Sequence, residues 1–341
     1  MKIGLISDIH FGYHHGSRVN ADGVNVREQD FIDAGSAALS NLVSRGVDVI
    51  VDGGDMAQVP APKQRAISAL IEHVRGVDPL RYLSADGNHT SLKSTADIHL
   101  YEILSQECPN FVGAVGGPML TEEGIALIPH DYDPEVVKRR IDQVMAEEPM
   151  MIVGHFAASN VPFDRTKVDV AFLPRHIPVW LGHYHCHTLS SDGLPNYIGS
   201  TERTGWDQWE FPTGATIFDT DTGETEYIPH DARKFVNLVA DATNYLDVFE
   251  GVDLNDAIVR LSITATPQEW DALDTNRTKR LAAASNALEY SQRRTKDANK
   301  EDVNVEPAGS ESIVEGWKKH VASSDTANRK EVEARGIEVL G

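Results

Sequence analysis

Carboxylate, amide and imidazole side chains recur in this sequence directly after short apolar segments that have the composition of β-strands. In an α/β sheet the strand ends converge on one edge, where ligands bind. Five separate strand ends could therefore direct these side chains to one place. The residues concerned are Asp8 and His10, Asp55, Asn88 and His89, His155, and His183 with His185.

This mixture of side chains is suited to divalent metal chemistry. Imidazole and carboxylate without thiolate are appropriate for Mn²⁺, Fe²⁺ or Zn²⁺. Two ions about 3.5–4 Å apart can clamp a phosphate, lower the pKa of a bridging water and support in-line displacement. Asp55 is the candidate for a shared ligand, because it is the only carboxylate after Gly53 and Gly54 at the second strand end. Those glycines would allow the backbone to approach the ions closely.

Each motif is weak when it is considered alone. Gly-Asn is common in turns, and His-x-His can be a pair of polar strand residues that point the same way. The occurrence of all five groups in order, each after a predicted strand, favours a shared metal centre. The remaining histidines are expected at the surface or as helix caps, and they include His14, His15, His73, His99, His130 and His187.

The first two thirds of the chain alternate strand-like and helix-like patterns. This alternation predicts an α/β protein with layered sheets and helices outside them. Strands are expected at residues 2–7, 47–52, 80–85, 125–129, 150–154, 179–182, 196–199 and 215–219, and helices at 28–45, 62–75, 95–105 and 134–147.

The pattern changes after about residue 235. A strand at 257–265, a helix at 267–287 and a returning strand at 288–294 predict a small βαβ-like cap, with Pro267 in the first helical turn. The polar stretch 297–310 resembles a linker, followed by short helices at 311–322 and 328–336. The predicted division is a catalytic domain at 1–230, a capping domain at 231–296, and a linker with a helical tail at 297–341.

Composition limits the classes of function. The 341 residues carry a formal net charge of −21, which is unusual for a DNA-binding protein because phosphates are neutralised by Lys and Arg. A local basic groove or bound cations can reverse that field. No apolar stretch is long enough to span a bilayer, no signal peptide is evident, and two distant cysteines do not suggest disulfides. We expect a soluble cytoplasmic protein.

Taken together, the motifs resemble those of the calcineurin-like metallophosphoesterases. The resemblance covers about residues 1–205 and implies a two-sheet sandwich flanked by helices, with a small α/β C-terminal cap. Residues 197–203, Tyr-Ile-Gly-Ser-Thr-Glu-Arg, are similar to a segment of SbcD-type exonuclease subunits, which act in DNA double-strand-break repair. The family motifs are matched by Asp8-Ile-His10, Gly54-Asp55, Gly87-Asn88-His89, Gly154-His155 and Gly182-His183-Tyr-His185.

The resemblance also implies roles for individual residues. Two divalent ions, with Mn²⁺ preferred, would be held by Asp8, His10, Asp55 and His185, and by Asp55, Asn88, His155 and His183. His89 would stabilise the scissile phosphate or protonate the leaving oxygen, and Gln58 and Arg203 would contact substrate. Thr90 stands where the family often has Asp, so the orienting partner of His89 must come from elsewhere. Gln58 replaces a His that is common in the nuclease subgroup.

Three functions are compatible with these residues. The first is a Mn²⁺-dependent DNA exo/endonuclease subunit that works with an SMC-like ATPase, which residues 311–335 could bind, and that forms a homodimer through helices 28–45 and 95–105. The second is a phosphodiesterase for nucleotides or other small phosphodiesters, which the acidic balance and Gln58 favour. The third is a non-catalytic interaction protein, against which the intact ligand set argues.

Overall fold

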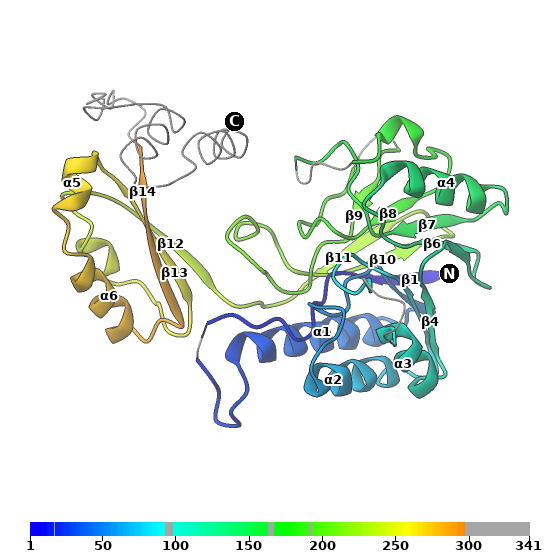
Figure 1. Cartoon of the computed structure of the whole chain (residues 1–341), viewed down its shortest axis with the longest axis horizontal. Coiled ribbons are helices and arrows are strands. Elements are labelled where there is room, and N and C mark those ends of the chain that lie inside the picture. The colour runs from blue at the N-terminus through cyan, green and yellow to red at the C-terminus, as the bar shows by residue number, and fades with distance from the viewer. Residues whose placement is uncertain (17, 93–97, 163–166, 191–192, 297–341) are drawn as a thin grey trace, which may run out of the picture. The chain divides into compact units, whose positions relative to one another are not determined.

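The computed structural model describes residues 1–296 except 17, 93–97, 163–166 and 191–192 (Figure 1). The larger sheet has the strand order β11-β10-β1-β2-β3-β4. Strands β1 to β4 are parallel, whereas β10 and β11 run antiparallel to their neighbours. The strands are β1 (Lys2–Ile6), β2 (Val49–Asp52), β3 (Arg81–Ala85), β4 (Phe111–Ala114), β10 (Gly214–Asp219) and β11 (Thr225–Pro229).

A second, five-stranded sheet has the order β5-β6-β7-β8-β9. Strands β6 to β9 are parallel, and β5 is antiparallel to β6. In both sheets the parallel strands therefore end at a common edge. The strands are β5 (Met119–Leu120), β6 (Ile125–Ile128), β7 (Met151–Gly154), β8 (Val179–Leu181) and β9 (Asn196–Tyr197).

Apolar residues on alternate positions of the strands build separate cores on the two faces of a sheet. Ile3 and Leu5 of β1 pack with residues of β6, β7 and β8 in a core between the two sheets. Ile6, at the opposite parity, packs with α1 (Val26–Ser44), α2 (Gln64–Arg75) and α3 (Leu100–Glu107). A third core lies beneath α4 (Pro134–Met145).

These cores make a layered α/β arrangement of helices, two sheets and a further helix, which confirms the predicted fold class. Figure 1 shows α1, α2 and α3 gathered on one side of the sheets and α4 on the other. Helix α1 begins two residues before its predicted start, because the Asn25 side chain accepts hydrogen bonds from the backbone N–H of Arg27 and Glu28. Strands β4, β5 and β11 were not predicted.

The C-terminal part of the described chain forms a three-stranded sheet in the order β12-β13-β14, with β12 (Phe235–Asp241), β13 (Ile258–Thr264) and β14 (Glu289–Thr295). Backbone bonds from Leu288 to Ala257 and from Ala265 to Thr295 show that β13 and β14 run parallel. This agrees with the predicted βαβ connection, to which β12 adds an unpredicted strand.

The single helix predicted at 267–287 is wrong, because two helices occupy this stretch. Helix α5 (Pro267–Asp271) begins with a reciprocal capping box between Thr266 and Glu269. Helix α6 (Thr275–Ala284) follows Asp274, whose carboxylate accepts a hydrogen bond from the backbone N–H of Arg277. A carboxylate that caps a new helix competes with continuation of the old one.

The contacts between residues divide the chain into two compact units. The first comprises Met1–Asn237, Gly251–Arg260 and Arg280–Ser291, and the second comprises Leu238–Glu250, Leu261–Lys279 and Gln292–Gly341. The predicted linker and tail at 297–341 lie outside the described residues. Within the part of the chain that is described, no helix has both the length and the apolar character needed to cross a bilayer. Cys108 and Cys186 are buried and free of disulfides, as expected.

Candidate metal centre

The residues singled out at the strand ends of both sheets lie together in the first unit. Asp8, Asp55 and Asn88 follow β1, β2 and β3 of the larger sheet, whereas His155 and His183 follow β7 and β8 of the smaller one. Three overlapping groups have ligand atoms within 4.8 Å of one another. These groups are Asp8, His10 and His185; His10, Asp55 and His89; and Asp8, Asp55 and His155.

One end of the cluster is centred on His185. The Nε2 atom of His185 lies 3.4 Å from Asp8 Oδ1 and 3.2 Å from His10 Nε2. Asp8 is fully buried, and its carboxylate also accepts hydrogen bonds from the Ser7 hydroxyl at 2.6 Å and from the His183 backbone N–H. This end is called the His185 end below.

The other end is centred on His155. Its Nε2 atom lies 3.2 Å from Asp55 Oδ2 and 3.1 Å from Asn88 Oδ1, and His183 Nδ1 lies 2.9 Å from the same Asn88 oxygen. Asp55 belongs to one group with His155 and to another with His10, and Asp8 belongs to groups with His155 and with His185, so that both carboxylates lie between the two ends. This end is called the His155 end below.

The donor chemistry of the His155 end fits a cation. His155 Nδ1 lies 2.7 Å from the carbonyl oxygen of Gly53, and a carbonyl can only accept, so Nδ1 carries a proton. In the neutral imidazole Nε2 is then a lone pair, which faces the oxygens of Asp55 and Asn88. Three lone-pair donors turned toward one another repel unless a positive charge lies between them. A proton or a divalent metal ion would supply that charge.

Strained backbone conformations are concentrated in this cluster. Asp8, His10, Asp55 and His183 have φ angles of 53°, 44°, 56° and 73°, in the left-handed region that favours glycine. Conformations of this kind cost of order 1–3 kcal/mol each and are typical of functional sites. Here they direct side chains from three turns, after β1, β2 and β8, toward one point.

Two glycines leave the space that the cluster occupies. A Cβ atom on Gly87 would lie 2.1 Å from Asp55 Oδ1, and one on Gly54 would lie 2.4 Å from His155 Nδ1. No side chain could be accommodated at either position without displacing a candidate ligand. Steric exclusion therefore explains why glycine occurs at these positions of the Gly-Gly-Asp and Gly-Asn-His motifs.

The surroundings of the cluster lower the pKa values of Asp8, Asp55 and His10. Burial alone would raise the pKa of Asp8, but His185 outweighs it and holds that pKa well below its usual range. Asp55 is lowered likewise, because His155 outweighs the effect of burial. Burial, reinforced by His185, lowers the pKa of His10 to about 3. Both carboxylates are therefore ionised and His10 is neutral at pH 7, the states required for metal ligation.

His89 is oriented by a backbone carbonyl and not by a carboxylate. Its Nδ1 donates to the carbonyl oxygen of Gln58 at 2.8 Å, and its backbone N–H donates to Asp55 Oδ1 at 2.8 Å. Thr90, which replaces the family's Asp, bonds to Asp86 instead. The Gln58 carbonyl thus provides the orienting partner that the sequence lacked, while its side-chain Oε1 is buried without a hydrogen-bond partner.

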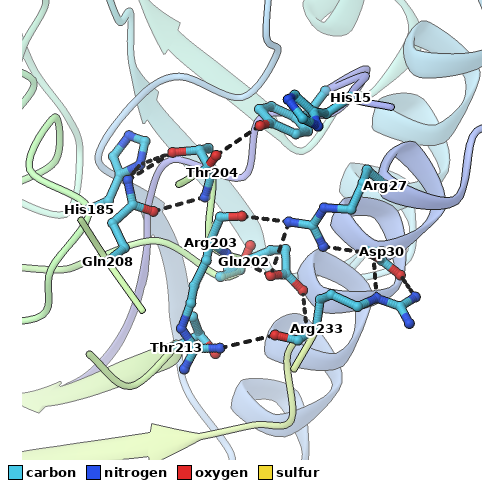
Figure 2. Close-up of polar contacts among 12 residues, drawn as sticks. His15, Arg27, Asp30, His185, Glu202, Arg203, Thr204, Gln208, Thr213 and Arg233 are labelled. Atoms are coloured by element: carbon cyan, nitrogen blue, oxygen red, sulfur yellow. Dashed lines mark hydrogen bonds and ion pairs between the residues drawn. The ribbon is translucent and has the colours of Figure 1, made fainter. Parts of the chain in front are cut away.

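The structure does not bring Arg203 into the cluster. Its guanidinium donates to the carbonyl oxygens of Phe211 and Arg233, at 2.9 and 3.4 Å. Figure 2 shows this side chain extending away from His185, toward Thr213. The sequence places Arg203 after the last His pair but does not indicate which way its side chain points. The observed geometry does not support the predicted contact between Arg203 and substrate.

Several histidines differ from the expectation of surface or capping residues. His99 does cap α3, and it also lies 3.2 Å from Asp86, whereas His73 is buried. His130 packs against the rings of His155 and His183, with centroids 6.0 and 5.4 Å away. Because His130 follows β6 as closely as other cluster residues follow their strands, the strand-end signal could have found it.

A pocket of about 280 Å³ lies against the cluster. Its lining includes Asp55, Asn88 and His89 from the larger sheet and His183 and His185 from the smaller one. Thr204, Asp207 and Gln208 complete another wall. A phosphate that entered this pocket would therefore meet candidate ligands from both ends together with His89.

The chain is similar in sequence to proteins of DNA double-strand break repair. No family model matches the chain. A DNA double-strand break repair protein Mre11 from Halobacterium salinarum is 25% identical over 317 residues, covering 83% of this chain and 77% of that protein. The Mre11 protein of Saccharolobus solfataricus is 23% identical over 247 residues, covering 64% of this chain and 60% of that protein.

Among solved structures, an archaeal phosphodiesterase has a TM-score of 0.37 and 13% identity, covering 67% of this chain and all of that one. A TM-score this low does not by itself establish a common fold. The sequence relatives and the clustered carboxylate, amide and imidazole ligands carry the assignment. The chain is a metal-dependent phosphodiesterase or nuclease that is similar in sequence to proteins of DNA double-strand break repair.

Proposed function

We propose that the chain is a nuclease that hydrolyses phosphodiester bonds of DNA by a two-metal mechanism. The observation that carries the proposal is the position of Asp55 between the two ends, where carboxylate, amide and imidazole ligand atoms lie close together. Similarity to two DNA double-strand break repair proteins supports DNA as the substrate.

Two divalent cations, Mn²⁺ by preference, fit the two ends of the cluster. When bound, such ions offset phosphate charge and lower the pKa of a nearby water. The Asp55 carboxylate would be common to both sites. The ligands would be Asp8, His10, Asp55 and His185 for one ion, and Asp55, Asn88, His155 and His183 for the other.

His89 is proposed as the general acid. Its Nδ1–H is held by the Gln58 carbonyl, which fixes the ring and leaves Nε2 as the position that can exchange a proton. In the imidazolium form, Nε2–H would pass its proton to the leaving oxygen as the bond to phosphorus breaks. The unpartnered Oε1 of Gln58 can accept a hydrogen bond from substrate or water but cannot supply a proton.

Cleavage of linear DNA in the presence of Mn²⁺ tests the proposal. Wild-type protein should cleave, and His89→Ala should reduce the rate by about 10²- to 10⁴-fold, the usual contribution of general acid–base catalysis. His14→Ala, a change at an exposed histidine, is the matched control and should leave the rate unchanged. Failure of the wild-type protein to cut DNA would contradict the nuclease assignment.

The composition of the pocket favours one alternative, a phosphodiesterase for nucleotides or other small phosphodiesters. Among the described residues that line the pocket there is no Lys or Arg, and Asp207 adds a negative charge. A polyanion gains affinity mainly from Lys and Arg contacts. Turnover of bis-p-nitrophenyl phosphate, cyclic nucleotides and DNA should be compared, and a clear preference for a small diester would replace the nuclease proposal.

The remaining sequence predictions stay proposals. An SMC-like ATPase partner should co-purify with the full chain, and deletion of 311–335, outside the described residues, should abolish that association. A homodimer through helices α1 and α3 should sediment at twice the chain mass, and a strict monomer would refute it. Residues 231–296 would form the cap, and the protein would be cytoplasmic.

A further inference from the structure

The ring of His185 is contacted from outside the cluster by two side chains that follow the last His pair. Its Nδ1 atom lies 3.2 Å from Thr204 Oγ1 and 3.1 Å from Gln208 Nε2. Gln208 is buried, although Asp207 beside it is exposed. Thr204 and Gln208 lie in a segment that contains neither a candidate metal ligand nor the proposed general acid His89.

The hydrogen bonds of Gln208 fix which way its amide points. Its Oε1 accepts from the backbone N–H of Thr204 at 2.9 Å, and a backbone N–H can only donate. Its Nε2 therefore faces the Thr204 hydroxyl, at 2.8 Å, and donates to it. Gln208 thus holds Thr204 by both main chain and side chain.

These contacts decide which partner can stabilise His185 as a metal ligand. For Nε2 to turn a lone pair toward Asp8 and a cation, the neutral ring must carry its proton on Nδ1. Gln208 Nε2 can only donate and cannot accept that proton. The hydroxyl oxygen of Thr204 can accept it, and it is the one acceptor of this pair.

The backbone of this segment is clamped by a buried ionic network (Figure 2). Arg27, which is 2% exposed, donates to the carbonyl oxygen of Arg203 at 2.6 Å and lies 3.5 Å from Glu202. Glu202 accepts from the backbone N–H groups of Arg203 and Arg233, at 2.7 and 2.8 Å. The clamp fixes the chain next to Thr204, and so fixes where its hydroxyl meets His185.

We propose that Thr204 is a positioning residue that accepts the Nδ1–H bond of His185 and so directs Nε2 into the cation site, with Gln208 holding the hydroxyl in place. The segment 197–203 and its continuation would thereby act on the metal centre through His185 and not through Arg203. The inference rests on the proposed function, because it takes His185 as a metal ligand.

Calorimetric titration of the metal-free full chain with Mn²⁺ tests this without measuring activity. Thr204→Val keeps the shape of the side chain and removes the acceptor. It should weaken one of two Mn²⁺ sites by about 10- to 100-fold, as loss of an outer-shell partner does, and leave the other within about threefold. Thr204→Ser restores a hydroxyl and should bind as the wild type does.

Matched controls separate positioning from packing. Thr213→Val alters another buried threonine, whose hydroxyl faces the His230 carbonyl, and should leave both sites unchanged. Melting temperatures in chelator establish that each variant is folded. If Thr204→Val does not fold, Gln208→Ala should show a smaller loss at the same site, and unchanged binding in that variant would overturn the inference.

The possible outcomes separate failure of the positioning role of Thr204 from failure of the proposed metal-dependent function. Wild-type affinity at both sites in a folded Thr204→Val protein would overturn the role of Thr204. Equal losses in Thr204→Val and Thr204→Ser would reduce the residue to packing and overturn it too. Absence of Mn²⁺ binding by the wild-type protein would instead overturn the proposed function itself.

Discussion

The two ends of the cluster hold their central imidazoles by different means. At the His155 end, Nδ1 is fixed by the main-chain carbonyl of Gly53, and the ring is fully buried. At the His185 end, Nδ1 meets the side chains of Thr204 and Gln208, and the ring is 16% exposed. A main-chain partner is present whatever residue supplies it, whereas a side-chain partner depends on its residue type.

The difference also separates what the fold provides from what individual residues provide. Gly53 follows β2 of the larger sheet and His155 follows β7 of the smaller one, so their hydrogen bond joins the two sheets at the common edge. Assembly of the sheets thus prepares the His155 end. The His185 end additionally requires the segment that carries Thr204 and Gln208.

The largest effect on Mn²⁺ affinity should come from substituting Asp55, the carboxylate that we propose both ends share. Asp55→Asn keeps the size of the side chain but removes the charge, so affinity at both Mn²⁺ sites should fall by more than the roughly 100-fold upper range for outer-shell changes. Asp22→Asn, at an exposed position, is the control. Calorimetry showing loss at one site alone would contradict the shared position of Asp55.

A smaller, one-sided effect should follow from Gly54→Ala. Its Cβ would lie 2.4 Å from His155 Nδ1, and the residue has a φ of 110°. The matched control is Gly46→Ala, which has a φ of 70° but no atom within 4 Å of its Cβ. Left-handed φ alone costs about 1–2 kcal/mol, and the clash should add about 1–3 kcal/mol.

Urea denaturation in chelator measures both free energies of unfolding, and Mn²⁺ titration should show weakening at the His155 end alone. Equal free energies of unfolding for Gly54→Ala and Gly46→Ala would show that the close packing around His155 has been overestimated. Loss at both metal sites would show that the two ends are not separable.

A change of pH should act on the His155 end without any substitution, by a small step for each pH unit. Burial lowers the pKa of His155, but attraction and hydrogen bonding to Asp55 outweigh it and raise the pKa from 6.5 to about 9. Because the folded pKa exceeds the unfolded one, this pair stabilises the metal-free protein fully below pH 6.5 and progressively less as pH rises through 9. A cation must displace the same proton, so Mn²⁺ affinity should rise about tenfold per pH unit over this range.

Urea denaturation in chelator and Mn²⁺ titration at several pH values measure the two trends. His155→Gln removes the titrating group, so its metal-free stability should depend less on pH between 6.5 and 9 than that of the wild type. The same pH dependence in both proteins would assign the effect to other groups.

The strand-end positions of the cluster could be predicted because they depend on local patterns. Each ligand follows a short apolar strand, and parallel strands must end at one edge. The two glycines before Asp55 led to the prediction that it is the shared carboxylate, which stays a prediction. Strand β4 (Phe111–Ala114) was missed because it is short and includes Gly113, so its pairing with β3 depends on distant contacts that local periodicity does not record.

Other features could not be predicted because they depend on the path of a loop. Thr204 and Gln208 meet His185 where the contacts of Arg27 and Glu202 with Arg203 hold the chain just before Thr204. The same path turns the Arg203 guanidinium toward carbonyl oxygens and away from the cluster. The orienting partner of His89 is a main-chain carbonyl, which no residue type reveals.

Anomalous diffraction at the manganese absorption edge, from crystals grown with Mn²⁺, tests the central claim most directly. Two peaks about 3.5–4 Å apart, on either side of the Asp55 carboxylate, are the predicted result. No peak at the cluster, or a single peak that Asp55 does not touch, would contradict the binuclear account.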